Sequence, residues 1–200
     1  MAYTDSRDLY ISFLKKHLSK ERFLHTLAVE KEAISLAERY NVDIEKASLA
    51  GLLHDCAKGF SDEELVRLAI SYNIPLSVWD LSSPQILHAP VGSIFAREYF
   101  GIKDRDILGA IWKHTTGDRE MSTLDKIIFI ADYIEYHRDF PGVSYLREIV
   151  KKDIDRAILF AINLTIGYIM RNNQMIHPKT VEVWNYLIKE GRGFLDEVNS

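Results

Sequence analysis

Hydrophobic residues recur every three or four positions along most of the chain, which is the period of an amphipathic α-helix. The clearest stripe has the spacing i, i+3, i+4 and i+7 and consists of Ala47, Ala50, Gly51 and His54. Its small members allow a neighbouring helix to approach closely. No stretch sustains the alternation of apolar and polar residues that is typical of a half-buried strand. The pattern therefore predicts an all-α protein.

Capping residues divide this pattern into separate helices. A Ser or Asp side chain before an apolar run accepts hydrogen bonds from the first free N–H groups of a helix. Such residues predict helix starts at Asp5 or Ser6, Ser19, Asp43, Ser61, Asp104 or Asp106, Ser122 and Asp153. Pro90 and Pro178 fit the first turns of two more helices. Residues 72–85, with two prolines, are expected to be the least regular segment.

Composition narrows the class of protein. With 200 residues, of which 47% are hydrophobic and 27% charged, the chain can bury one core without disulfides. The net charge of −4 provides no basic field for nucleic acid. The single cysteine, Cys56, suits a reducing cytoplasm. The polar start MAYTDSRDLY has no signal peptide, and no apolar run reaches the roughly 18 residues of a membrane span, so we expect a cytoplasmic protein without membrane contact.

Six side chains of the metal-ligand type stand at helix ends or on apolar helix faces. They are His25, His54, Asp55, His88, His114 and Asp132. The adjacent His54 and Asp55 offer an imidazole and a carboxylate, a natural pair of ligands for a hydrolytic metal. Asp132 follows the apolar run Ile127–Ala131, where a buried carboxylate is costly without a cation. The set predicts a metal site.

Each of these residues also has an ordinary structural interpretation. His54 and His114 suit helix C-termini, where the helix dipole favours imidazolium. His88 suits a loop before Pro90, and Asp132 suits an intrahelical ion pair, although Ile128 and Tyr136 at i−4 and i+4 carry no charge. The joint occurrence of all six in this order favours metal binding.

The order His, His-Asp, His, His, Asp resembles the HD-domain phosphohydrolase superfamily. Longer motifs are similar to the bacterial YqeK family, and they cover nearly the whole chain after Ser19: RFLHT (22–26), AGLLHDCAK (50–58), HAPVG (88–92), HTTG (114–117), DYIE (132–135), RDFPG (138–142) and IHPKTV (176–181). The HD pair alone indicates only the superfamily, whereas HAPVG, HTTG and RDFPG together are specific.

The resemblance implies a single HD domain over residues 1–200, a helical bundle with its metal site between central helices. Residues 1–18 would form an N-terminal helix without a motif, and residues 172–200 would hold a C-terminal helix. The implied activity is hydrolysis of phosphoric anhydrides, namely symmetrical cleavage of diadenosine tetraphosphate to two ADP. The implied cofactor is iron, as one or two ions, with other divalent metals as alternatives.

Carried over by motif, the superfamily pattern assigns His25, His54, Asp55 and Asp132 to one metal. A second metal would be bridged by Asp55 and bound by His88 and His114. With one metal, these two histidines would face the phosphates instead. The sequence leaves both arrangements open.

The chemistry expected of these residues is attack by an iron-bound hydroxide on the tetraphosphate, with Asp55 and Lys58 as catalytic residues. Loss of a nucleoside diphosphate requires charge neutralisation, which Lys58 can supply. The expected substrate contacts are Arg22, Asp55, Lys58, His88, His114, Thr115, Arg138 and His177. We assign no role in the site to His17 or His137, and a structural role to Cys56.

Three other functions remain open at this point. The metal site would also suit a nucleotidase acting on nucleoside mono- or triphosphates, because it does not by itself set the leaving group. A nucleotide-binding regulatory protein would belong to another class, but it need not keep a complete ligand set. An oxygenase could use a di-iron site, although Lys58 and the other phosphate contacts favour hydrolysis. The expected partners are nucleotides alone, with a homodimer as an open question.

Overall fold

The structure is a computed structural model that describes residues 3–191, with side chains from residue 7 onward. Within those residues the chain forms eleven α-helices and one short 3₁₀ helix, and no strand. The helices are α1 (Tyr3–His17), α2 (Lys20–Tyr40), α3 (Ile44–Leu53), α4 (Asp62–Ser71), α5 (Val78–Ser82), η1 (Pro84–Leu87), α6 (His88–Phe100), α7 (Arg105–Lys113), α8 (Thr123–Ile134), α9 (Val143–Ile149), α10 (Ile154–Arg171) and α11 (Pro178–Lys189). The predicted all-α class is confirmed.

Most helix starts lie where the capping residues predict them. The Ser19 hydroxyl accepts from the N–H of Arg22 at 3.2 Å, and Asp43 accepts from the N–H of Lys46 at 3.0 Å. Ser61 and Ser122 each form a full capping box with an acidic residue three positions on. The first helix differs, because it begins at Tyr3 and contains residues 5 and 6.

Three short helices were not predicted. Helix α5 lies in the segment 72–85, η1 begins at the end of that segment, and α9 follows the turn at residues 140–142. Each has seven residues or fewer, too few for a hydrophobic period to show. Helix α6 begins at His88 itself, so this residue is helical rather than part of a loop.

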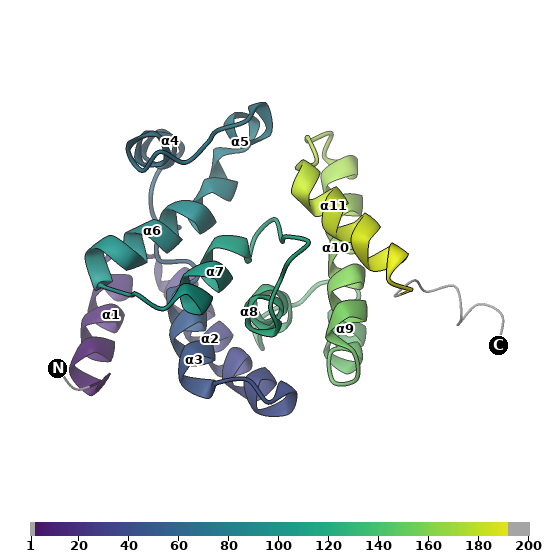
Figure 1. The fold of residues 1–200 in the computed structure, drawn as a ribbon, viewed down its shortest axis with the longest axis horizontal. Coiled ribbons are helices and arrows are strands. Elements are labelled where there is room, and N and C mark those ends of the chain that lie inside the picture. The colour runs from purple at the N-terminus through teal and green to yellow at the C-terminus, as the bar shows by residue number, and fades with distance from the viewer. Residues whose placement is uncertain (1–2, 192–200) are drawn as a thin grey trace.

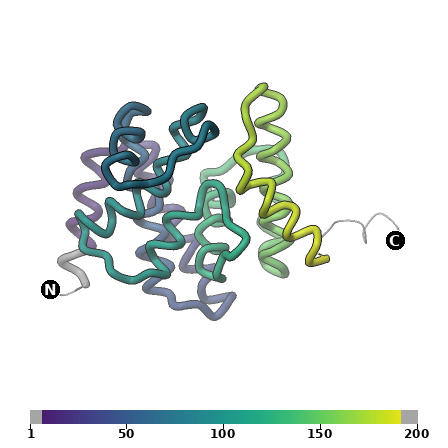
Figure 2. Tube along the Cα trace, turned by 45° about the horizontal axis from the view of Figure 1, so that its top comes forward, coloured from purple at the N-terminus to yellow at the C-terminus, as the bar shows by residue number. Residues whose placement is uncertain are grey.

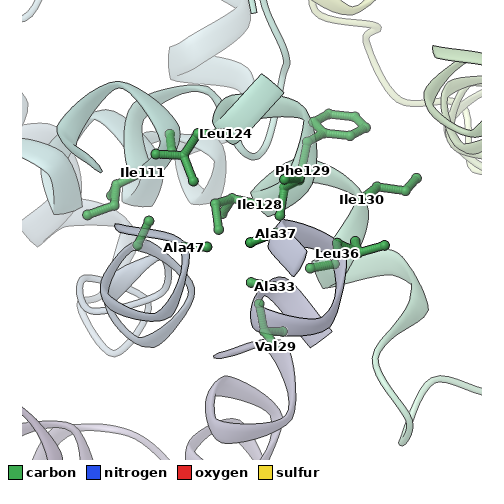
Figure 3. Packing of buried hydrophobic residues seen from close by; sticks show 14 of the residues in the cluster. Val29, Ala33, Leu36, Ala37, Ala47, Ile111, Leu124, Ile128, Phe129 and Ile130 are labelled. Atoms are coloured by element: carbon green, nitrogen blue, oxygen red, sulfur yellow. The ribbon is translucent and has the colours of Figure 1, made fainter. Parts of the chain in front are cut away.

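The core lies between α2, α3, α7 and α8. Figure 3 shows Ala37 of α2 and Ala47 of α3 beside Ile128 of α8. All three side chains are fully buried. Because alanines are short, the axes of α2 and α3 come close to α8, and the packing density of the interior is kept.

Gly51 permits a close approach between α2 and α3. A β-carbon at this position would lie 3.0 Å from Glu30 Cα and 3.2 Å from Ala33 Cβ, so any larger residue would push the two helices apart. The ring centroids of His25 on α2 and His54 at the end of α3 are 5.5 Å apart. The predicted stripe of small residues therefore sets the distance between two candidate metal ligands.

The remaining helices flank this centre (Figure 1). Helix α1 lies at one side, and α9, α10 and α11 lie at the other. Figures 1 and 2 agree that α10 and α11 run side by side, with α4 and α5 at a separate edge. A smaller apolar cluster under α4 and α6 includes Ala57, Leu65, Leu87 and Val91. No described helix is both long and apolar enough to cross a bilayer.

The single-domain boundaries at residues 1–200 stay a prediction. Of the C-terminal stretch 172–200, the structure shows α11, and residues 192–200 lie outside the described part.

Candidate metal centre

The six predicted ligands come together in one cluster, although they belong to separate parts of the chain. His25 comes from α2, His54 and Asp55 follow α3, His88 begins α6, His114 follows α7, and Asp132 lies in α8. Their ligand atoms form three overlapping groups, in each of which all atoms lie within 4.8 Å of one another. All but Asp132 are buried, and the Asp132 side chain is 22% exposed. The helix bundle therefore converges on these side chains.

Asp55 lies at the centre of the cluster, and its two oxygens face different histidines. Oδ2 is 3.6 Å from His54 Nε2 and 3.9 Å from His25 Nε2. Oδ1 is 3.1 Å from His88 Nε2 and 3.7 Å from His114 Nε2. One carboxylate thus separates two pairs of imidazoles, an arrangement in which it can bridge two cations.

All four histidines present Nε2 to the centre, because each Nδ1 has an acceptor of its own. His54 donates from Nδ1 to the carbonyl of Gly51 and His114 to that of Ile111, both at 2.7 Å. His88 donates in the same way to the carbonyl of Gln85. Since the proton of a neutral imidazole is then on Nδ1, each Nε2 keeps its lone pair for a metal.

The ring of His25 is held by a carboxylate instead of a backbone carbonyl. Its Nδ1 donates to Glu135 Oε1 at 3.1 Å, and its Nε2 lies 3.0 Å from Asp132 Oδ1. Glu135 is buried, and its second oxygen accepts from the N–H of His137 at 2.6 Å. A carboxylate behind a ligand imidazole orients the ring and raises its basicity.

Sequence reasoning missed this role of Glu135, although the residue lies in the motif quoted above. The available signal was its spacing, three residues after Asp132 and one residue past the end of α8. That spacing carries it towards the same helix face as Asp132. Nothing in the sequence identified His25 as its partner, which lies 110 positions away.

Asp132 has a cationic partner that the sequence did not indicate. Arg138 donates to its carboxylate at 2.5 Å and to its backbone carbonyl at 2.7 Å. Arg138 lies six residues after Asp132 and past the end of α8. It is therefore outside the i−4 and i+4 positions at which an ion pair within the helix was expected. The expected phosphate ligand therefore also braces a candidate metal ligand.

The protonation of the cluster follows from burial and mutual charge. Burial lowers the pKa of His54 to about 4. Burial acts to raise the pKa of Asp55 and of Asp132, but the surrounding histidines, with Arg138 near Asp132, hold both pKa values well below the usual range. For His25 burial acts to lower the pKa, and Asp132 and Glu135 outweigh it and raise the value. Near neutral pH the centre thus combines carboxylates with a neutral His54.

Two buried atoms test whether the centre fits a metal. Nε2 of His54 has no hydrogen-bond partner among the described residues, and Nε2 of His25, although it lies 3.0 Å from Asp132 Oδ1, makes no hydrogen bond either. A buried nitrogen without a partner is costly, and a cation between these two rings and the carboxylates would remove that cost. Imidazole and carboxylate donors suit divalent transition metals. The residues present therefore fit such an ion.

A cavity of about 170 Å³ opens on the cluster and is lined by most of the predicted substrate contacts. It is bounded by Arg22, Asp55, Lys58, His88, His114, Thr115, Asp132, Tyr133 and Arg138. Lys58 Nζ lies 3.2 Å from His88 Nδ1, and Thr115 Oγ1 lies 3.2 Å from His88 Nε2. Arg22 donates to Asp55 Oδ2 at 3.2 Å. Three cations and a hydroxyl thus face the same space as the candidate ligands.

A second cavity, of about 450 Å³, adjoins the first, since Arg22 and Arg138 line both. It also includes His25, Glu135 and His137. His137, for which the sequence indicates no role in the site, lines this cavity.

His177 is not among the residues around the cluster. It caps the start of α11 by accepting from the N–H of Lys179, and it lines a third cavity, of about 220 Å³. Cys56 is buried, with its thiol 3.5 Å from the carbonyl oxygen of Gly92. His17 bonds to the carbonyl of Phe13 on its own helix, outside all the residues that line these cavities.

The chain resembles known proteins over most of its length. The family of the HD domain matches residues 22–137. A Halalkalibacterium halodurans protein named bis(5'-nucleosyl)-tetraphosphatase, symmetrical, is 41% identical over 185 residues, which cover 92% of this chain and 98% of that protein. A Bacillus subtilis protein of the same name is 37% identical over 183 residues, with the same two shares.

A solved structure is also similar. It is the crystal structure of a predicted HD superfamily hydrolase involved in NAD metabolism from Clostridium acetobutylicum. It is 40% identical, has a TM-score of 0.90, and is matched over 92% of this chain and 97% of that one.

Proposed function

The chain belongs to the HD-domain family, and from that membership we propose that it hydrolyses diadenosine tetraphosphate symmetrically to two ADP. The family resemblance expected from the sequence is confirmed by the match to residues 22–137 and by relatives covered over 98% of their length. The proposed substrate is inferred from the names of these relatives. The cluster supplies the chemistry that such a substrate requires.

The observation that carries the proposal is one cavity in which Arg22, Lys58 and Arg138 face Asp55 and two histidines. A tetraphosphate bridge is a dense polyanion, and charge neutralisation governs the loss of a nucleoside diphosphate. The chain as a whole has a net charge of −4, so the cations for this purpose have to be local.

The HD domain and the His/Asp cluster indicate a divalent metal. We propose iron, held by His25, His54, Asp55 and Asp132, with His88 and His114 available to a second ion together with Asp55. The donor set suits iron, and it also suits other divalent transition metals. When bound, such an ion supplies Lewis acidity that acidifies water and polarises a phosphoryl oxygen.

The residues of the chain would position the phosphates around that ion. Arg22 and Lys58 would each bind a phosphate oxygen, and the Thr115 hydroxyl would donate to another. Arg138 would hold Asp132 in place while its remaining N–H groups face the cavity. Burial lowers the pKa of Lys58, and a phosphate bound beside it would act in the opposite direction, because a nearby negative charge favours the charged form of the amine.

The test is a comparison of substrates with metal-loaded protein prepared without oxygen. Diadenosine tetraphosphate, ATP and a panel of mononucleotides would be offered, and the products would be resolved by chromatography. We expect ADP as the sole product of the first. AMP with ATP would mean asymmetric cleavage and would refute the proposal. Faster turnover of a mononucleotide would favour the nucleotidase instead.

Lys58→Ala provides a variant for the same assay. We expect kcat/KM to fall about a hundredfold, since one charge-stabilising group is removed. Lys126→Ala is the matched control, because Lys126 pairs with Asp155 at 2.6 Å and lines none of the cavities described above. Equal losses in both variants would remove Lys58 from the site. The cytoplasmic location and the homodimer stay predictions.

A further inference from the structure

The third cavity, of about 220 Å³, lies between α5, the start of α6, the end of α7 and the start of α11. Figure 1 shows α5 facing the start of α11. The cavity walls include Pro75, Ile86 and Trp112, and the polar side chains that line it are Ser77, Asp80, Thr116, His177 and Lys179. Apolar walls with a small number of polar groups are typical of a site for a small organic ligand.

Asp80 and His177 present an acceptor and a donor side by side. Asp80 uses Oδ2 to accept from the N–H and the hydroxyl of Ser77, at 2.8 and 2.5 Å. Its other oxygen, Oδ1, lies 3.6 Å from His177 Nε2, which is too far for a hydrogen bond between them. Both side chains are mostly buried, at 16% and 18% exposed.

The tautomer of His177 is fixed by its cap. Its Nδ1 accepts from the N–H of Lys179 at 3.2 Å, so in a neutral ring the proton is on Nε2. Burial lowers the pKa of His177, which keeps the ring neutral near pH 7. The cavity thus offers one acceptor oxygen and one N–H donor next to each other.

This cavity is next to the phosphate-facing one along two segments. Ala89 lines it and follows His88 in α6, and Thr116 lines it and follows Thr115 after α7. A ligand that reached from one cavity to the other would pass along the same two backbone segments.

We propose that this cavity binds an adenine base of the dinucleotide, with the exocyclic amine donating to Asp80 Oδ1 and a ring nitrogen accepting from His177 Nε2–H. The proposal rests on the proposed function, because a substrate cut symmetrically has two identical halves, and each half needs a place for its base. The base would pack against Trp112 and Pro75, as bases do on aromatic side chains.

The acceptor oxygen of Asp80 makes the cavity selective for a base that carries an exocyclic amine at the position of the adenine amine. Hypoxanthine carries a carbonyl oxygen in place of the adenine amine, so it would set an acceptor against the Asp80 carboxylate. A polar group left without a partner in a partly buried site lowers affinity strongly. We expect the metal-loaded protein to bind ADP about tenfold more tightly than IDP.

Asp80→Asn tests this contact. The carbonyl oxygen of the new amide is needed by the N–H of Ser77, so its NH₂ group would face His177 and suit the oxygen of hypoxanthine. Titration calorimetry of the metal-loaded variant should show the preference for ADP over IDP reduced about tenfold or reversed. Asp106→Asn is the matched control, since Asp106 pairs with Lys46 at 2.6 Å and neither residue lines the cavity. An unchanged preference in Asp80→Asn would overturn the proposal.

Tryptophan fluorescence gives a second readout if Asp80→Asn does not fold. ADP should change the emission of the wild type and of Trp79→Phe, because Trp79 lies outside the cavity lining. The response should vanish in Trp112→Phe. A response that survives in Trp112→Phe would place the base elsewhere.

The two proposals fail separately. Symmetrical turnover with no ADP/IDP preference would refute the base pocket alone. The binding preference without turnover of the tetraphosphate would refute the proposed reaction alone.

Discussion

The two faces of Asp55 are built differently. On the inner face, defined by His25, His54 and Asp132, two imidazole nitrogens have no hydrogen-bond partner among the described residues, and two carboxylates stand beside them. On the cleft face, defined by His88 and His114, the two Nε2 atoms lie 3.0 Å from each other and border the cavity with Lys58 and Thr115.

This difference indicates different tasks. The inner face combines two imidazoles with two negative charges and is braced from behind by Glu135 and Arg138. The cleft face has two imidazoles, shares one carboxylate with the inner face and borders the cavity together with the cation Lys58 and the Thr115 hydroxyl. We therefore expect a tightly held ion on the inner face, and on the cleft face either a second ion or a phosphate oxygen.

The largest effect is expected from Asp55→Ala, which removes the group common to both faces. Metal content should fall to background, and turnover should drop by on the order of 10⁴-fold or more, because the chemistry depends on the ion. Elemental analysis measures the metal content and a turnover assay measures the activity. Circular dichroism checks that the variant is folded. Normal metal content with full activity would show that the carboxylate is not a ligand.

The next experiment separates the faces directly by comparing His25→Ala with His88→Ala. His25→Ala should abolish metal binding on the inner face. His88→Ala should retain one ion per chain and lose about a hundred- to a thousandfold in kcat. The measurement is metal content per chain alongside turnover. If both variants lost metal to the same extent, the faces would be equivalent and our distinction wrong.

A smaller effect is expected behind the inner face. Glu135→Gln keeps an acceptor for His25 Nδ1–H but removes the charge, and its amide cannot serve His25 and the N–H of His137 equally. Metal affinity should fall about ten- to a hundredfold in a competition with a chelator. Glu148→Gln, at an exposed ion pair with Lys151, should change nothing. Unchanged affinity in Glu135→Gln would make that carboxylate only a packing group.

The smallest effect is expected at His177, a histidine that belongs to neither face of Asp55. The effect of changing it is the reference against which the effects at the two faces are compared. Because its pKa in the folded protein is below the ordinary 6.5, the unfolded chain binds more protons, and the stability it contributes is lost as pH falls below 6.5. His177→Asn keeps a capping oxygen without a titration. Urea unfolding at several pH values should show less acid sensitivity in the variant, by under about 1 kcal/mol. Equal sensitivity would mean that the cap does not titrate.

The sequence predicted the elements whose causes are local. The caps at Ser19, Asp43, Ser61 and Ser122 depend on residues within one turn, and the stripe that ends at His54 depends on helical spacing alone. The six candidate ligands were found because buried polar residues stand out against an apolar pattern.

What the sequence could not predict depends on contacts between distant residues. Glu135 orients the ring of His25, which lies on another helix. Arg138 reaches Asp132 only because the chain turns after α8. The short helices α5 and α9 are fixed by their neighbours, since seven residues or fewer carry no period of their own. The cavity next to His177 likewise joins α5 to α11, which begin a hundred residues apart at Val78 and Pro178.

The acceptors of the four ring Nδ1 atoms also bear on the order of folding. For His54, His88 and His114 the acceptor is the carbonyl three residues earlier, so each ring is oriented as soon as its own helical turn forms. The ring of His25 is oriented by Glu135, which lies 110 residues away along the chain. Closing a loop of that length carries an entropy cost that local turns avoid. We therefore expect three imidazoles to be oriented on their own helical turns early in folding, and the fourth only when the end of α8 docks against α2.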